Sequence, residues 1–192
     1  MLSLPLQRMS IDKNSLNSEN KMLKRVDIST YCCHSVEIDG YIPFSICFNE
    51  KSPDLYWRGG NGQNSLVEIG LLKTGELSTI TLVSFSRQDL IENHKDLFYN
   101  ESKKTYLPIF DVSFWMVNTE NFSNIFIDKL SSELRLFIGK NYVEVTFLPL
   151  ESAIDYVKDS NFGFGFNDDE LVALQILNLD ENRINLLRES LQ

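Results

Sequence analysis

The chain has 192 residues, of which 43% are hydrophobic and 23% are charged, and its formal net charge is −9. This composition is typical of one folded domain with a substantial core, and it excludes a chain that is disordered over most of its length. Because 27 acidic residues outnumber 18 basic ones, we expect neither a nucleic-acid partner nor a membrane surface as partner. The charge fits a cationic protein partner, or it serves solubility alone.

The chain is predicted to be cytoplasmic. Its first residues do not resemble a signal peptide, since no basic segment precedes the apolar run and a proline interrupts it. No segment reaches the roughly 20 apolar residues that a membrane-spanning helix needs. An odd number of cysteines with an adjacent pair does not form a disulfide framework, so we expect reduced thiols at Cys32, Cys33 and Cys47.

The first predicted pair of strands follows a polar N-terminal arm. Residues 1–25 predict that arm, and 26–192 predict a single α+β domain. β-forming residues over 26–38 end at the turn signal Asp39-Gly40, and strict alternation predicts a second strand over 44–48. We expect the two strands to form a hairpin.

A loop and a second hairpin follow. Residues 49–65 contain a proline and a cluster of glycine and asparagine, which predicts a loop. The apolar runs 66–72 and 77–85 predict two paired strands. Gly75, between them, is expected to supply the positive φ of their short connection.

The middle of the chain gives weaker signals. Apolar spacing predicts a helix over 87–98, with Ser86 as its N-cap. The apolar and aromatic residues 109–117 predict a buried strand. Residues 122–130 fit a helix or a strand equally well.

The C-terminal part predicts a third hairpin and a closing helix. The hairpin covers 134–138 and 142–147, and a short helix is expected over 151–158. A further strand is predicted over 170–179. Asp180 is expected to cap a last helix whose apolar stripe faces the sheet. In total we expect about eight mostly antiparallel strands in a curved or half-barrel sheet, packed by this C-terminal helix and one to three further helices.

No metal or cofactor site is predicted. Cys32, Cys33 and His34 are the first place to look for zinc, but adjacent residues of a strand point to alternate faces. Cys47 and His94 would complete a site only by accident of the fold. We therefore assign these cysteines to a buried strand.

Catalytic residues are not predicted either, which favours a non-enzymatic protein. His34 and His94 are the only two histidines, so few groups titrate near neutral pH without help. A dyad of Cys33 with His94 is conceivable, but no local nucleophile signature accompanies it.

Two segments are predicted to contact a protein partner. The first is the loop with aromatic and arginine side chains beside glycines, because such residues are enriched at interface hot spots and on functional loops. The second is an acidic turn that suits a basic partner. The predicted partner-binding residues are Tyr56, Trp57, Arg58, Tyr106, Asp168, Asp169 and Glu170.

These features lead to one main functional hypothesis. A small acidic cytoplasmic domain with aromatic loops and no catalytic constellation is expected to bind a protein, as a bacterial immunity protein binds a basic toxin. Acidic patches would attract the partner, and aromatic anchors would then be buried against it.

Two alternatives remain from the sequence. The first is a carboxylate-dependent hydrolase or small-ligand domain that uses Glu68, Asp111 or Asp168 as acid or base. For Glu68, alternation does not decide which face of its strand it occupies. The second is a subunit of a larger assembly that docks through an exposed sheet edge.

Overall fold

A computed structural model describes residues 22–30, 35–92, 106–113, 126–127, 133–147, 153–159 and 161–191. For residues 126–127 only the backbone is described. Residues 1–21 of the predicted N-terminal arm lie outside this part. From the same arm, Leu23 is 1% exposed and packs in the core, and Arg25 begins the first strand.

The first sheet contains six strands within the described residues, in the order β2-β3-β6-β5-β4-β9. Neighbouring strands are antiparallel except for the short parallel contact of β4 with β9. The strands are β2 (Ser35–Glu37), β3 (Phe44–Cys47), β4 (Leu55–Gly60), β5 (Ser65–Leu71), β6 (Leu77–Phe85) and β9 (Phe126–Ile127).

The second sheet also contains six strands in the described segments, in the order β12-β13-β14-β11-β10-β7. All its pairs are antiparallel except β10 with β7. The strands are β7 (Leu90–Glu92), β10 (Leu134–Ile138), β11 (Val143–Phe147), β12 (Asp155–Lys158), β13 (Phe162–Asn167) and β14 (Glu170–Ile176).

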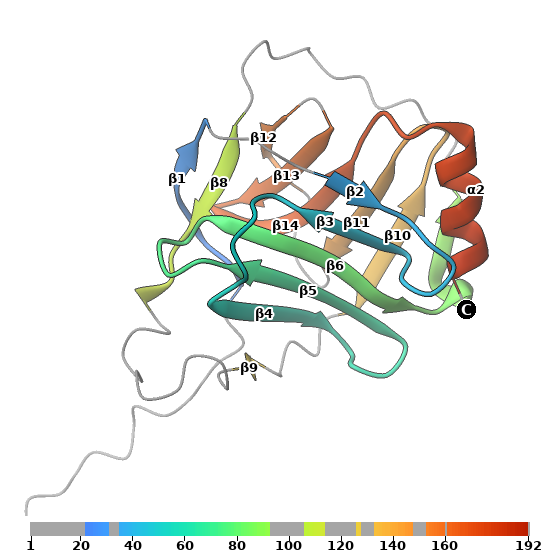
Figure 1. Cartoon of the computed structure of the whole chain (residues 1–192), viewed down its shortest axis with the longest axis horizontal. Helices are drawn as coiled ribbons and strands as arrows, with labels where there is room; N and C mark the ends of the chain where they lie inside the picture. Colours follow the sequence, from blue (N-terminus) through green and yellow to red (C-terminus); the bar gives the residue numbers. More distant parts are fainter. Residues whose placement is uncertain are drawn as a thin grey trace, which may run out of the picture.

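The two sheets pack face to face around one hydrophobic core, with the first sheet in front of the second in Figure 1. Phe48 meets Phe162 edge-on at 5.2 Å between ring centroids, and Trp57 meets Phe147 at 5.3 Å. Edge-to-face contacts at these distances are favoured by the ring quadrupoles. The architecture is therefore a β-sandwich.

A two-stranded ribbon, β1 (Arg25–Ser29) with β8 (Leu107–Phe110), joins the sheets along one side (Figure 1, left). The Phe110 N–H donates to the Gly75 carbonyl of the first sheet at 2.9 Å, and the Tyr106 N–H donates to the Lys158 carbonyl of the second at 3.2 Å. The ribbon thereby bridges both sheets and covers that side of the core.

The helix α2 (Glu181–Ser190) lies at the opposite side of the sandwich (Figure 1, right). Asp180 caps it by accepting the Arg183 N–H at 2.8 Å, as predicted. Ile184 and Leu187 are buried, and Arg188 pairs with Glu92 of β7 at 2.9 Å. The helix is therefore tied both to the core and to the edge of the second sheet.

The sequence predicted the class of this fold in part. The mostly antiparallel sheets and the C-terminal helix are confirmed, as are the hairpins β5–β6 and β10–β11. The first hairpin is confirmed only in part: of the predicted strand 26–38, residues 35–37 form β2 and pair with β3, whereas the start belongs to β1, which pairs with β8. The single curved sheet of about eight strands is wrong, because the strands are divided among two six-stranded sheets and the ribbon. In the described ranges, the only α-helix eight or more residues long is α2.

Two predicted helices are strands where the structure describes them. In 87–98, a 3₁₀ turn η1 (Arg87–Asp89), capped by Ser86, leads directly into β7, and residues 93–98 are outside the described part. In 151–158, residues 155–158 form β12. Both are short strands at the edge of a sheet, where packing imposes a strand-like alternation on few residues. Their apolar residues could therefore be spaced like those of a helix.

The predicted loop 49–65 contains the strand β4. Its residues alternate, so that Leu55 and Trp57 face the core while Tyr56 and Arg58 face outward. Gly59 points inward, where an added Cβ would lie 2.7 Å from the Trp57 ring. The two glycines that predicted a loop are thus part of the strand, and Gly59 makes room for the tryptophan.

A glycine comparison tests the β5–β6 turn. Gly75 has φ +85°, as predicted, and an added Cβ would lie 2.1 Å from the Phe110 carbonyl oxygen of the ribbon. Gly62 has φ +70° and nothing within 4 Å of that position. We expect Gly62→Ala to lower the free energy of unfolding by about 1 kcal/mol from backbone strain, and Gly75→Ala to lower it by clearly more, because a clash is added.

Urea unfolding of both variants measures the difference. Equal losses for Gly75→Ala and Gly62→Ala would show that the ribbon moves aside at no cost, contrary to a fixed contact between Gly75 and Phe110.

Candidate functional site

The predicted contact residues of β4 fall on opposite sides of the first sheet. Trp57 is 0% exposed and belongs to the core, so its side chain is not accessible to a partner in this structure. Tyr56 and Arg58 are half-buried on the outer face. The loop composition suggested three neighbouring anchors, but a strand displays only every second residue on one face.

Glu68 lies opposite Arg58 on this outer face, which settles the register left open by the sequence. The Arg58 guanidinium donates to Glu68 Oε2 through Nε at 2.7 Å, and Nη2 lies 2.6 Å from the same oxygen. This carboxylate is already engaged with an arginine. Asp111 accepts the Ser113 N–H next to the ribbon, and Asp168 occupies the β13–β14 turn. The three carboxylates proposed for hydrolysis thus occupy three separate elements.

The acidic turn joins β13 to β14. Asp168 and Asp169 have φ of 48° and 65°, the conformation of a two-residue type I′ hairpin turn. Asp169 is engaged within the chain, because Arg25 contacts its Oδ1 at 2.6 Å and also reaches Asp155 at 2.8 Å. Asp168 and Glu170 are exposed.

Tyr106 is half-buried at the start of β8, where its backbone bonds to β12. It belongs to a different element from Tyr56 and Arg58, which share the outer face of the first sheet. The predicted residues therefore do not form one continuous site.

An exposed tyrosine that the sequence did not single out lies between β2 and β3. Tyr41 is 91% exposed, the highest value among the exposed large hydrophobic side chains of the described residues. The Asp39 carboxylate holds its turn by accepting the N–H groups of Tyr41 at 2.6 Å and Ile42 at 2.7 Å. These bonds lower the pKa of Asp39 below its usual 3.8, since they favour the ionised form.

A second turn of the same kind lies beside it. The Asn61 side-chain oxygen accepts the N–H groups of Gln63, Asn64 and Ser65 at 2.9, 2.8 and 3.1 Å. An Asx turn of this kind fixes the backbone locally without burial. Both loops are thus held by their own side chains.

These two turns border a hollow of about 250 Å³. Tyr41, Pro43, Gln63, Asn64 and Val83 line it, together with Ser84–Ser86 of the first sheet's end and Ser190 of α2. Val83 and Ile42 are 41% and 40% exposed. We call the surface formed by Tyr41, Ile42, Val83 and this hollow the Tyr41 corner. The Asp39-Gly40 turn signal was the sequence feature that pointed to it.

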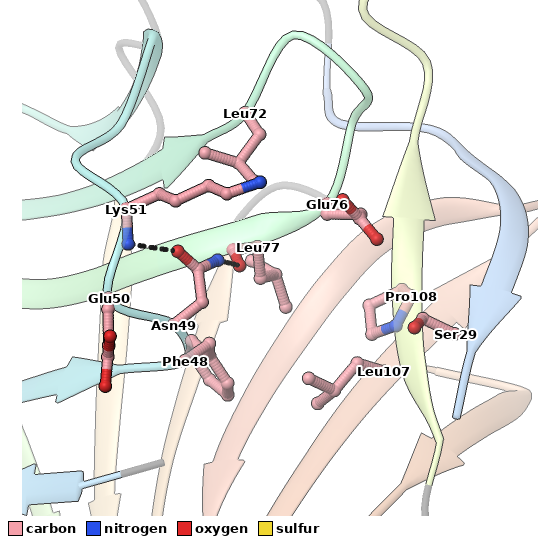
Figure 2. Close-up of a pocket in the computed structure, with 10 residues that line it drawn as sticks. All are labelled: Ser29, Phe48, Asn49, Glu50, Lys51, Leu72, Glu76, Leu77, Leu107 and Pro108. Atoms are coloured by element: carbon pink, nitrogen blue, oxygen red, sulfur yellow. Dashed lines mark hydrogen bonds between the residues drawn. The ribbon is translucent and has the colours of Figure 1, made fainter. Parts of the chain in front are cut away.

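A larger cleft of about 440 Å³ opens at the other end of β6 (Figure 2). Two segments lie along one edge of β6 near its start, the end of β3 and the strand β8, and they diverge from each other there. Phe48 donates its N–H to the Ser78 carbonyl, whereas β8 bonds to Gly75 at Phe110. Pro108 has no N–H to continue that pairing. The cleft occupies the gap between the β3 end and β8.

The walls of the cleft combine apolar and polar side chains. Its apolar lining comes from Phe48, Leu72, Leu77, Leu107 and Pro108. Its polar lining comes from Ser29, Asn49, Glu50, Lys51 and Glu76. A concave apolar site of this size with a few polar groups is the usual form of a small-ligand site.

Hydrogen bonds hold the loop wall of the cleft in place. Asn49 Nδ2 donates to the Leu77 carbonyl at 2.7 Å, and its Oδ1 accepts the Lys51 N–H at 2.8 Å (Figure 2). The Ser78 hydroxyl donates to the Lys51 carbonyl at 2.6 Å. The cleft is therefore formed before any ligand arrives.

The outer face of the second sheet carries a third polar group of side chains. Gln175 is 3% exposed and donates from Nε2 to Glu144 on the neighbouring strand, while its Oε1 has no partner in the described part of the chain. Burial raises the pKa of Glu144, although the Gln175 bond opposes this. Burial, with the Glu144 charge as a smaller cause, raises the pKa of Tyr156 to about 12. At neutral pH the Tyr156 phenol is therefore protonated.

The candidate metal and dyad residues of the sequence are mostly outside the described residues. Cys32, Cys33, His34 and His94 are among the undescribed positions. Cys47 is the exposed last residue of β3, so the expectation of a buried cysteine is wrong for this position, and its thiol donates to the Asn49 carbonyl at 2.9 Å. Where the chain is described, no three His, Cys, Asp or Glu side chains are grouped so as to hold a metal ion. In the same segments, no helix has the length and apolar character to cross a membrane.

No protein-family model matches this chain, and no curated protein matches it significantly.

An NMR titration tests the Asp39 turn. Its pKa is lowered in the folded protein, so the stabilisation it gives is present above 3.8, the ordinary value, and is lost as the pH falls through the lower folded value. We expect the amide signals of Tyr41 and Ile42 to titrate with a midpoint below 3.8. A midpoint at or above 3.8 would mean that the carboxylate does not hold the turn.

A second titration concerns Glu144, whose pKa is raised by burial. Its contribution to stability is complete below the unfolded value of 4.5 and is lost as the pH rises through the higher folded value. We expect the unfolding free energy of the wild-type protein to fall across that window, and Glu144→Gln to remove this part of the fall. Chemical unfolding at a series of pH values measures it.

The exposed Glu133 offers a matched control for that experiment. Because this side chain is exposed, Glu133→Gln should change the unfolding free energy little, and the pH dependence caused by Glu144 should remain. If the unfolding free energies of Glu144→Gln, Glu133→Gln and the wild type depend on pH in the same way, burial does not raise the pKa of Glu144.

Proposed function

We propose that this chain is a cytoplasmic protein-binding domain that recognises a cationic partner through the Tyr41 corner. The observation that carries the proposal is an almost fully exposed tyrosine held by the Asp39 turn, beside a second turn held by Asn61. Tyrosine is among the residues enriched at binding hot spots. It offers a large contact area with few rotatable bonds.

Preorganisation of the two turns supports this function. A partner that binds a mobile loop must order it, which costs part of the binding free energy. The Asx bonds of Asp39 and Asn61 have already ordered both loops of the corner. The hollow between them offers a recess for a side chain of the partner, next to the exposed parts of Ile42 and Val83.

The charge of the chain supports a cationic partner. A net charge of −9 attracts a basic protein over distances of about a Debye length and accelerates its association at low salt. The more specific form of the proposal is that the chain is an immunity protein and that the partner is a basic toxin which it neutralises.

Substitution of Tyr41 tests the proposal. Immobilised wild-type chain is used to capture a partner from a lysate of its source organism at low salt, and the purified pair is measured by calorimetry. We expect Tyr41→Ala to weaken binding at least about tenfold, since a buried hot-spot aromatic is worth about 2 kcal/mol. Its unfolding free energy should change by less than about 0.5 kcal/mol because the side chain is exposed.

Ile154 supplies the matched control, because it is 75% exposed and lies beside β12 in the second sheet. Ile154→Ala should bind like the wild type. Equal binding by Tyr41→Ala and Ile154→Ala would exclude the Tyr41 corner as the interface. A captured partner that does not slow growth when expressed alone would exclude the toxin-neutralising form while leaving protein recognition intact.

A further inference from the structure

The cleft between β3, β6 and β8 carries opposite charges above an apolar lining. Lys51 and Glu76 both line it, from different loops. In Figure 2 the Lys51 side chain extends along the upper edge of the cleft past Leu72, and the Glu76 carboxylate lies on the side of Pro108. The charges of the two residues are therefore presented at one opening.

These two charges do not neutralise each other. The salt bridges of the described residues include none between Lys51 and Glu76, and the Lys51 ammonium has no partner among those residues. The Glu76 carboxylate accepts one bond, from the Thr74 hydroxyl at 2.8 Å. An ammonium and a carboxylate that share a cavity without pairing are both available to a ligand.

We propose that this cleft binds a small apolar zwitterion, which is an apolar amino acid or a short apolar peptide. Its carboxylate would pair with Lys51, its ammonium would pair with Glu76, and its side chain would lie on Phe48, Leu77 and Leu107. This is a second activity of the protein, and it does not depend on the Tyr41 corner.

The shape of the cleft agrees with this class of ligand. Its volume of about 440 Å³ falls in the range of small-molecule sites, which is about 300–1,000 Å³. The apolar lining favours a hydrocarbon or aromatic side chain. The bonds of Asn49 and Ser78 fix the loop that carries Lys51, so binding does not have to order it.

The charges also exclude simpler ligands. A purely anionic ligand would face Glu50, Glu76 and the net charge of −9. A purely cationic one would meet the Lys51 ammonium. A neutral apolar ligand would use the lining but would leave both charged groups without a partner near a partly desolvated surface. A zwitterion satisfies both ends at once.

Ligand analogues test the proposal on the wild-type protein. Amide chemical shifts are followed by NMR while leucine, phenylalanine or a leucyl-leucine dipeptide is added at millimolar concentrations. N-acetyl-leucine lacks the ammonium and leucinamide lacks the carboxylate. We expect shifts at Phe48–Lys51 and Leu72–Leu77 with the zwitterions, and about two- to fivefold weaker binding of both analogues.

The comparison of leucine with the dipeptide assigns the spacing of the charges. Tighter binding of the dipeptide identifies a peptide ligand, and tighter binding of leucine identifies a free amino acid. Absence of shifts at the cleft with every zwitterion overturns the proposal, as does equal binding of leucine, N-acetyl-leucine and leucinamide.

Charge variants provide an independent measurement. Lys51→Met and Glu76→Gln should each weaken binding about two- to fivefold. The controls are Glu133→Gln and Lys73→Met, which lies on the same turn as Glu76. Neither residue lines the cleft, and both variants should bind like the wild type. Equal binding by all four variants overturns the assignment of Lys51 and Glu76.

The two proposed activities fail separately. Tyr41→Ala should leave the binding of leucine or the dipeptide unchanged, because Tyr41 does not line the cleft. A loss of zwitterion binding in Tyr41→Ala would overturn the independence of the two sites.

Discussion

The packing of Trp57 against Phe147 is the contact on which the sandwich depends. The tryptophan crosses from the first sheet into the core, and Gly59 leaves room for it: a Cβ there would lie 2.7 Å from the Trp57 ring and 3.2 Å from that of Phe147. A buried aromatic of this size contributes about 3–5 kcal/mol to stability. Because Trp57 faces inward, its neighbours Tyr56 and Arg58 must face outward, which fixes the composition of the outer face.

The sequence predicted local structure where several signals agreed. Gly75 between two apolar runs, and Asp180 before an apolar stripe, each combined a backbone requirement with periodicity, and both predictions are confirmed. The division into two sheets could not be predicted, because it depends on contacts such as Phe48 with Phe162, which are distant in the chain. β4 was missed since its glycines imitate a loop, and Trp57 was consequently expected at the surface.

The candidate sites are held by hydrogen bonds from polar side chains to the backbone. The sequence shows which polar residues could form such turns, but it does not show the surface that the folded turns create. Asp39 and Asn61 are visible as turn residues, but the exposure of Tyr41 is a property of the folded turn. The cleft arises where β3 and β8 separate along one edge of β6, and no local motif encodes that. The two sites lie near opposite ends of β6, roughly 20 Å apart at the rise of a strand.

The contact of Arg25 with Asp169 has a consequence for the order of events during synthesis. The two residues are 144 positions apart, and the Arg25 N–H also donates to the Asp169 carbonyl at 2.8 Å. The ribosome releases the N-terminal strand long before the β13–β14 hairpin exists. β8 precedes that hairpin in the chain and can pair with β1 earlier, but until then Arg25 of β1 lacks its guanidinium partners Asp155 and Asp169. The ribbon is therefore tied to the second sheet only when nearly the whole chain has emerged. Native closure is therefore a late, long-range step, which is typical of slowly folding β proteins.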